Sequence, residues 1–170
     1  AGYGDTVEFV VQEEQLGTGH AVVCAKPAFE QATKSGDQHD AFVLAGDGPL
    51  IRPATLCTLL GRHRAASAAA ALATSVIDDP TVYGRIVRDA SGVFKRIVEQ
   101  KNATDDELKI NEVNPSYYCF NASKLFNALE NVTRNELTGE YYITDVPQLL
   151  LEAGETVEVI DAVPPEDILS

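Results

Sequence analysis

The chain has 170 residues, of which 45% are apolar and 23% charged, and its formal net charge is −13 at pH 7. This length and composition suit a single domain with a hydrophobic core and exclude a disordered chain. Because so acidic a surface repels phosphate backbones and anionic lipids, we expect neither nucleic acid nor a membrane as a partner.

Strands and helices alternate through the first half of the chain. Continuous apolar runs predict buried strands, and a 3.6-residue apolar period predicts helices. Pro53 suits the first turn of a helix, whereas Pro27 would interrupt or kink one. The expected elements are a strand at Val7–Val11, a helix at Thr18–Ala32, a strand at Asp40–Ala45, a helix at Pro53–Ala65 and a buried strand at Ala68–Ile77.

The second half of the chain opens with a predicted hairpin, in which Arg85–Arg88 and Val93–Glu99 flank a turn that ends in Gly92. Strands that alternate with helices predict an α/β fold, namely a Rossmann-like, mixed and mostly parallel sheet flanked by helices on both faces. Ligands of such folds bind at the carboxyl ends of the strands. The remaining expected elements are a short helix at Thr104–Leu108, a strand at Ser116–Asn121, helices at Ser123–Leu129 and Thr144–Ala153, and a strand at Val157–Ile160.

The turn Gly17-Thr18-Gly19 follows the first predicted strand and opens the first predicted helix. Glycines remove side chains where a planar ring must approach, and the first amides of a helix are unpaired donors. Together with the side chain of Gln12, these donors could bind the edge of a uracil ring. The alternative is a purely structural turn, in which Thr18 caps the helix and glycine only allows the chain to bend.

Asp47 follows a short apolar strand, so its carboxylate is expected at the carboxyl end of a central strand. Mg²⁺ accepts one or two protein carboxylates and completes its shell with phosphates and water. The position therefore suits a magnesium site. An Asp-Gly pair is also a common turn former before a helix, and this sequence alone does not separate the two interpretations.

Glu99 and Asn114 are candidate ligands for a sugar. Glu99 ends a predicted strand and can accept hydrogen bonds from two hydroxyls, and Asn114 can both donate and accept. The alternatives are a solvated charge at a strand end for Glu99 and a turn residue for Asn114, which precedes Pro115.

The cysteines and histidines show no metal-binding spacing. Cys24, Cys57 and Cys119 are scattered, which predicts reduced core thiols and a cytoplasmic location. His39 and His63 lie among polar residues and are expected to be solvated.

Five segments, taken in order, resemble bacterial N-acetylglucosamine-1-phosphate uridyltransferases. That family is the pyrophosphorylase half of a bifunctional enzyme of peptidoglycan precursor synthesis. Five matches in the family's order are far more specific than any one of them. The matching segments are Glu14–Ala21, Gly46–Ile51, Asp79–Val87, Ile97–Thr104 and Gly139–Val146.

The resemblance implies a reaction and a set of site residues. The reaction transfers a uridylyl group from UTP to N-acetylglucosamine 1-phosphate, with release of pyrophosphate, and needs positioning and charge neutralisation rather than a covalent intermediate. Asp47 would be the catalytic metal ligand for Mg²⁺. The residues that would hold uracil are Gln12, Gln15, Gly17 and Thr18, and those that would line the sugar pocket are Gly84, Glu99, Asn114, Tyr142 and Thr144.

Three departures from the family pattern change the expectation for the isolated polypeptide. The family's opening Gly-rich loop and its Pro-Lys pair are not found, its Asn metal ligand would fall beyond Ser170, and Ser116 stands where the family usually has Gly. We therefore expect one partial nucleotidyltransferase domain over 1–170, without its first βα unit and without the β-helix acetyltransferase domain. Loss of several charged hydrogen bonds predicts negligible turnover by this polypeptide alone.

Two other interpretations stay open from the sequence. One is a non-enzymatic module that binds sugar nucleotides, and the other is a related pyrophosphorylase for a different sugar 1-phosphate. Retention of Asp47 favours an enzyme, because a simple binder has less need of Mg²⁺. A sheet edge left unpaired by the absent unit would also allow self-association.

Overall fold

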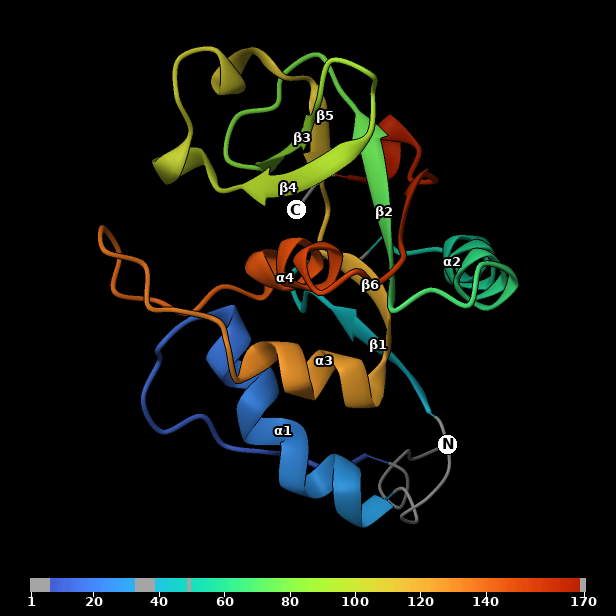
Figure 1. The fold of residues 1–170 in the computed structure, drawn as a ribbon, viewed down its shortest axis with the longest axis vertical. Coiled ribbons are helices and arrows are strands. Elements are labelled where there is room, and N and C mark those ends of the chain that lie inside the picture. Colours follow the sequence, from blue (N-terminus) through green and yellow to red (C-terminus); the bar gives the residue numbers. More distant parts are fainter. Residues whose placement is uncertain (1–6, 33–38, 49, 169–170) are drawn as a thin grey trace.

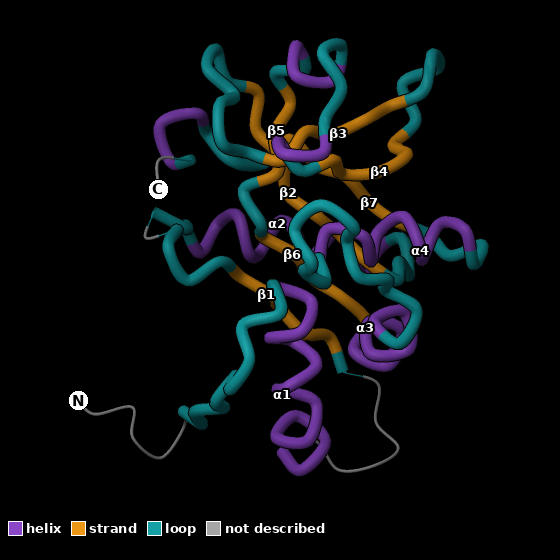
Figure 2. Tube along the Cα trace, turned by 90° about the vertical axis from the view of Figure 1, so that its left-hand side faces the viewer, coloured by secondary structure: helices purple, strands orange, loops and turns teal. Residues whose placement is uncertain are grey.

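A computed structural model describes residues 7–32, 39–48 and 50–168 of the chain (Figure 1). Its sheet has seven strands, with helices packed on both faces, as the tube view also shows (Figure 2). The α/β fold with flanking helices predicted from the sequence is therefore confirmed. The helices are α1 (Thr18–Ala32), α2 (Pro53–Ala65), α3 (Ala122–Leu129) and α4 (Val146–Glu152), and the strands are β1 (Asp40–Leu44), β2 (Ala70–Val76), β3 (Gly84–Arg88), β4 (Phe94–Val98), β5 (Glu112–Asn114), β6 (Tyr117–Asn121) and β7 (Val157–Asp161).

The prediction of a mostly parallel sheet is wrong. Among the described strands the order is β1-β6-β2-β5-β3-β4, with β7 paired to β2. Five of the six pairings are antiparallel, and only β2 with β7 is parallel. A parallel pair needs a crossover connection, whereas the tight β3–β4 hairpin reverses the chain, and β6 runs opposite to both of its neighbours.

Strand β2 joins the two parts of the sheet. Its first half pairs with β6 on one edge and with β7 on the other, and its last two residues pair with β5. Strands β5 and β6 thus follow one another along β2, interrupted by Pro115 and Ser116. Strand β5 was not predicted, because three residues around a single apolar Val113 carry too little periodicity.

The central strands are buried on both faces, which explains their continuous apolar sequence. On one face Leu72, Tyr118 and Phe120 pack against α3 and α4 in the larger core. On the other face Ala71 and Cys119 pack against Leu59 of α2. The small alanines of β2 allow the helices to approach the sheet closely on both sides.

Most of the predicted helices and strands are found within one or two residues of their expected bounds, including Pro27 inside α1 and Pro53 at the start of α2. The strand expected at Val7–Val11 is wrong: this segment forms no strand, and Phe9 is 90% exposed. A strand needs a neighbour to complete its hydrogen bonds, and no described segment pairs with this one. The short helix expected at Thr104–Leu108 is a 3₁₀ turn at Glu107–Lys109.

Two side-chain expectations also fail. His63 is one of the buried residues of α2: it is 3% exposed rather than solvated, and its Nε2 lies 3.1 Å from Asp40 Oδ1. Cys57 is exposed, so only Cys119 is a fully buried core thiol, and burial raises its pKa to about 12. No described helix has the length and apolar content needed to cross a bilayer.

Candidate functional site

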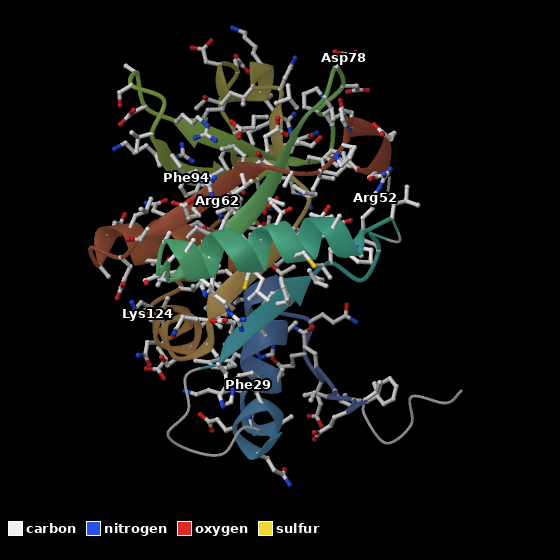
Figure 3. All side chains as sticks on the ribbon, turned by 90° about the vertical axis from the view of Figure 1, so that its right-hand side faces the viewer. Phe29, Arg52, Arg62, Asp78, Phe94 and Lys124 are labelled. Atoms are coloured by element: carbon white, nitrogen blue, oxygen red, sulfur yellow. The ribbon has the colours of Figure 1, made fainter. Side chains whose placement is uncertain are left out.

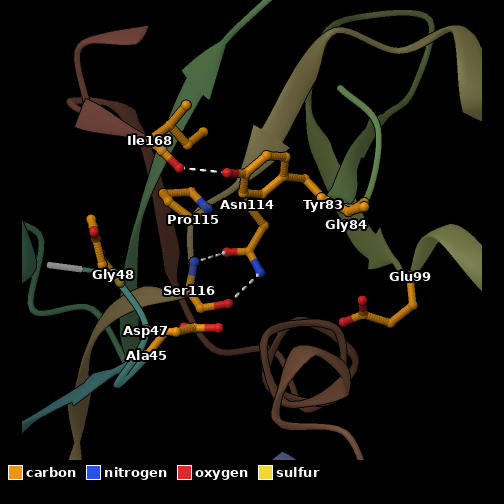
Figure 4. Close-up of a pocket in the computed structure, with 12 residues that line it drawn as sticks. Ala45, Asp47, Gly48, Tyr83, Gly84, Glu99, Asn114, Pro115, Ser116 and Ile168 are labelled. Carbon is orange, nitrogen blue, oxygen red and sulfur yellow. Dashed lines mark hydrogen bonds between the residues drawn. The ribbon is translucent and has the colours of Figure 1, made fainter. Parts of the chain in front are cut away.

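A cavity of about 280 Å³, here called the main cavity, lies where several strand ends meet. The turn after β1, the end of β4 and the break between β5 and β6 contribute to its wall, as does the segment that leads into β3 (Figure 4). The carboxyl ends of β1, β4 and β5 and the amino ends of β3 and β6 therefore meet at this cavity, as an antiparallel arrangement requires. Its lining residues are Ala45, Asp47, Gly48, Val82, Tyr83, Gly84, Glu99, Asn114, Pro115, Ser116, Tyr117 and Ile168.

The break between β5 and β6 shapes one wall of this cavity. Pro115 has no amide hydrogen for the ladder, and Ser116 has φ +62°, a left-handed conformation that interrupts a strand. The side chain of Asn114 replaces the lost ladder bonds, since its Oδ1 accepts from the Ser116 amide at 3.1 Å and its Nδ2 donates to Ser116 Oγ at 3.4 Å (Figure 4). The same Nδ2 donates to the Tyr118 hydroxyl at 2.7 Å. Asn114 is thus both a structural residue and a cavity residue.

Asp47 lies in the turn after β1, exposed and at the edge of the main cavity. Its carboxylate makes no hydrogen bond with the described residues, so all its lone pairs are open to a ligand. No group of three or more potential metal ligands occurs in the described part of the chain. One free carboxylate beside a cavity suits Mg²⁺, which keeps its waters and takes phosphate oxygens.

Glu99 occupies the opposite wall and is oriented by Thr144, whose hydroxyl donates to Glu99 Oε1 at 2.8 Å. The other oxygen, Oε2, faces Gly84: a Cβ on that glycine would lie 3.6 Å from Oε2 and 3.1 Å from Ile97 Cγ2. Glycine therefore keeps the space in front of the carboxylate open. Burial raises the pKa of the nearby Asp145 carboxyl, and the negative charge of Glu99 raises it further.

The glycines of the first loop contact protein backbone. The Gly19 amide donates to the Tyr141 carbonyl at 2.8 Å, and the Tyr141 amide donates to the Leu16 carbonyl at 2.7 Å. The Thr18 hydroxyl accepts from the Ile143 amide at 3.1 Å. Gly17 has φ +99°, and a Cβ there would lie 2.7 Å from the carbonyl oxygen of Tyr141. The segments 16–19 and 141–143 are thus joined like two paired strands.

A second hollow of about 350 Å³, here called the side cavity, lies beside this junction and shares Val82 and Glu99 with the main cavity. It brings together Thr18, Glu99 and Tyr142 from the sequence-predicted set. The Tyr142 hydroxyl donates to Thr138 Oγ1 at 2.6 Å, and burial raises the pKa of this phenol.

Six of the ten predicted site residues line the two cavities, and the four that line neither are Gln12, Gln15, Gly17 and Thr144. Asp47, Gly84, Glu99 and Asn114 share the main cavity. Gln12 lines neither hollow: its Nε2 donates to the Gly17 carbonyl at 3.1 Å and lies 2.9 Å from His20 Nδ1. Gln15 is exposed beside the same loop.

Sequence reasoning missed several residues that line the main cavity. The C-terminal segment places Ile168 in the wall of the cavity. Arg52, at the start of α2, holds this segment in place, since its Nη2 donates to Asp167 Oδ1 at 2.6 Å (Figure 3). The Tyr83 hydroxyl donates to the Ile168 carbonyl. Tyr83 could have been predicted, since it precedes Gly84 in the matching segment Asp79–Val87. Ile168 lies far from every matching segment, so the sequence does not indicate that it lines the cavity.

Val82 is a strained residue between the two cavities. It has φ +73°, which is unfavourable for a β-branched side chain, and it is 71% exposed. Its amide donates to the side chain of Gln100, which holds this conformation.

Val82→Gly is expected to stabilise the fold by about 1 kcal/mol, or about 2–4 °C in Tm, because relief of strain exceeds the added chain entropy. Thermal unfolding measures this effect. Val93→Gly is the matched control, since Val93 is 55% exposed and has no positive φ, and it should lower Tm. A drop of equal size for both variants would contradict strain at Val82.

The sequence matches known proteins over nearly its whole length. The chain is 45% identical over 163 residues to the bifunctional protein GlmU of Clostridium botulinum strain 657, which covers 96% of this chain and 34% of that protein. It is 49% identical over 150 residues to bifunctional protein GlmU of Listeria welshimeri, covering 88% of this chain and 32% of that protein. The chain thus spans about a third of the length of these relatives.

A solved structure and a family model agree with these matches. A crystal structure of UDP-glucose pyrophosphorylase complexed with UDP-glucose superposes with a TM-score of 0.65 at 15% identity, covering 95% of this chain and 62% of that chain, which supports the fold alone. Residues 2–163 match the family model described as nucleotidyl transferase. The chain therefore belongs to the nucleotidyl transferase family.

Proposed function

We propose that this chain is a nucleotidyltransferase domain that transfers a uridylyl group from UTP to N-acetylglucosamine 1-phosphate, giving UDP-N-acetylglucosamine and pyrophosphate. The observation that carries this proposal is the convergence of Asp47, Gly84, Glu99 and Asn114 on the main cavity. These residues come from four separate segments, and the resemblance in the sequence assigns each of them to the same reaction. The 45–49% identity to GlmU proteins supports it.

The reaction joins two anions in a chain that is itself strongly acidic. An oxygen of the sugar phosphate forms a bond to the α-phosphorus of UTP as the bond to pyrophosphate breaks, with no covalent enzyme intermediate. This chemistry asks the protein for alignment and for neutralisation of charge. Asp47 would hold Mg²⁺, which when bound offsets the phosphate charge that this chain, at −13, would otherwise repel.

The sugar would lie against Glu99 and Asn114. Glu99 Oε2 is free to accept from a sugar hydroxyl, because Thr144 occupies Oε1. Asn114 Nδ2 donates to the Tyr118 hydroxyl and, at 3.4 Å, to Ser116 Oγ, whereas Oδ1 keeps a second lone pair beyond its bond from the Ser116 amide. This lone pair suits a donor such as a sugar hydroxyl or the N–H of an acetamido group. Tyr142 would close the sugar pocket from the side cavity.

The uracil would lie along the loop from Gln12 to Thr18. Thr18 lines the side cavity, and Gln15 is exposed and makes no side-chain hydrogen bond with described residues. The inward face of this loop is occupied by Tyr141, so recognition would use its outer face. Self-association stays a prediction: β1 is the end of the strand order, and its outer edge pairs with no described strand.

The test measures UTP-dependent pyrophosphate release by the full-length protein with Mg²⁺. N-acetylglucosamine 1-phosphate should be preferred over glucose 1-phosphate. Preference for another sugar phosphate would overturn the sugar assignment, and absence of turnover with every sugar phosphate would favour a binding module.

Glu99→Gln is expected to raise the KM for the sugar phosphate by about 10–100-fold, because hydrogen bonds to a charged group contribute about 1.5–3 kcal/mol. The KM for UTP should change little. Thr144→Val should act in the same direction but less, by about threefold to tenfold, since Glu99 stays charged but loses its orienting partner. Glu130→Gln, which breaks an exposed ion pair with Lys26 just beyond the end of α3, is the control. An unchanged sugar-phosphate KM in Glu99→Gln would contradict this role.

A further inference from the structure

Tyr117 differs from the other tyrosines in and around the site. Its side chain begins β6, is 2% exposed and lines the main cavity. The hydroxyls of Tyr118, Tyr83 and Tyr142 all have partners in the protein. The Tyr117 hydroxyl forms no hydrogen bond with any described residue, and it is not among the fully enclosed polar atoms that lack a partner. Since buried phenols normally find a partner, this one faces the cavity with its hydrogen bond unused.

The Tyr117 hydroxyl occupies the space that a side chain at position 48 would need. A Cβ on Gly48 would lie 2.7 Å from the hydroxyl oxygen and 3.3 Å from the Tyr117 ring atom Cε1. The backbone does not require glycine here, since Gly48 has no positive φ. The turn that carries Asp47 is therefore shaped around this phenol.

The chemistry around the hydroxyl identifies what it can bind. No Lys or Arg lines the main cavity, and the acidic groups nearest the phenol include Asp167 and Asp47. A phenol is protonated at neutral pH and can donate to an anionic oxygen without adding negative charge. Asp47, the carboxylate proposed to hold a metal ion, lines the same cavity. The anionic oxygen expected in this cavity is therefore that of a phosphate.

We propose that the Tyr117 hydroxyl donates a hydrogen bond to a phosphate oxygen of the substrate, and that Gly48 is needed to leave room for it. This assignment rests on the proposed function. It gives the main cavity a neutral donor that compensates for the lack of a cationic side chain, and it makes Tyr117 a substrate-binding residue.

Calorimetric binding to the full-length protein in the presence of Mg²⁺ tests the assignment. Tyr117→Phe should weaken binding of UDP-N-acetylglucosamine by about tenfold and leave binding of uridine, which has no phosphate, unchanged. Thr58→Val, which removes a hydroxyl from the exposed side of α2, should match the wild type. Equal affinity of Tyr117→Phe and wild type for UDP-N-acetylglucosamine overturns the Tyr117 assignment alone. Failure of the wild type to bind overturns the proposed function as well.

A double-mutant cycle tests the role of Gly48. Gly48→Ala should weaken binding of UDP-N-acetylglucosamine by about tenfold, because the new methyl group displaces the phenol. In the Tyr117→Phe background the same substitution should change affinity less than twofold, since the closest remaining ring atoms are 3.3–3.4 Å away. If Gly48→Ala weakens binding by the same factor in the wild type and in the Tyr117→Phe background, the two residues act independently. That result would show that Gly48 serves another purpose and would overturn the coupling.

Discussion

Asp47→Asn is expected to lower uridylyl transfer by the full-length protein by a factor of about 10³ or more. The substitution keeps the shape of the side chain but removes the charge that would hold Mg²⁺ against the phosphates, and charge stabilisation by a metal ion contributes several kcal/mol to such a reaction. Stability should change by less than about 0.5 kcal/mol, since Asp47 is exposed and makes no hydrogen bond with the described residues. Turnover at saturating substrate and thermal unfolding measure the two effects.

The control for Asp47→Asn is Asp106→Asn, which removes a charge that is 92% exposed and paired only with Lys109. It should leave turnover unchanged. Titration with Mg²⁺ separates two explanations of a loss: a lost metal ligand shifts the Mg²⁺ dependence to higher concentration, whereas a disturbed turn lowers turnover at every concentration. A variant with full turnover and unchanged Mg²⁺ dependence would rule out Asp47 as the metal ligand.

The elements of this fold were predictable where local periodicity decides them. The helix at Thr18–Ala32 follows from apolar spacing. The buried strand near Ala70–Val76 follows from a continuous apolar run, although its alanines favour a helix by propensity. The direction of the strands did not follow, because strand direction depends on which edges meet in space and not on local pattern. Val7–Val11 has the composition of a strand but no described neighbour to pair with, so its propensity is not expressed.

The site was predictable only in part, for a similar reason. Asp47 and Glu99 each follow an apolar run, and that position at a strand end signalled a ligand residue before the structure brought them together. Asn114 was a candidate only because its side chain can both donate and accept. Tyr117 carried no such signal, since a tyrosine in an apolar strand is most often a core residue. Its role depends on the absence of a side chain at Gly48, which is 69 positions away in the sequence.

Gly17→Ala is expected to destabilise the fold by about 2–4 kcal/mol, lowering Tm by about 5–15 °C, and to abolish measurable UTP affinity. An alanine would have to adopt φ +99°, and its methyl group would lie 2.7 Å from the carbonyl oxygen of Tyr141 and 2.8 Å from Glu140 Cβ. The backbone strain and the overlap each contribute about 1–3 kcal/mol. Thermal unfolding and calorimetric titration with UTP measure the two losses.

The matched control separates the close approach from the backbone strain. Gly154 has φ +80°, and a Cβ there would meet nothing within 4 Å, so Gly154→Ala carries the strain without the overlap and should cost only about 1 kcal/mol. Equal destabilisation by both variants would mean that Tyr141 simply moves aside. A larger loss for Gly17→Ala would show that this glycine is required by the junction with Tyr141, and the uracil would then be recognised by a loop whose shape the protein backbone has already fixed.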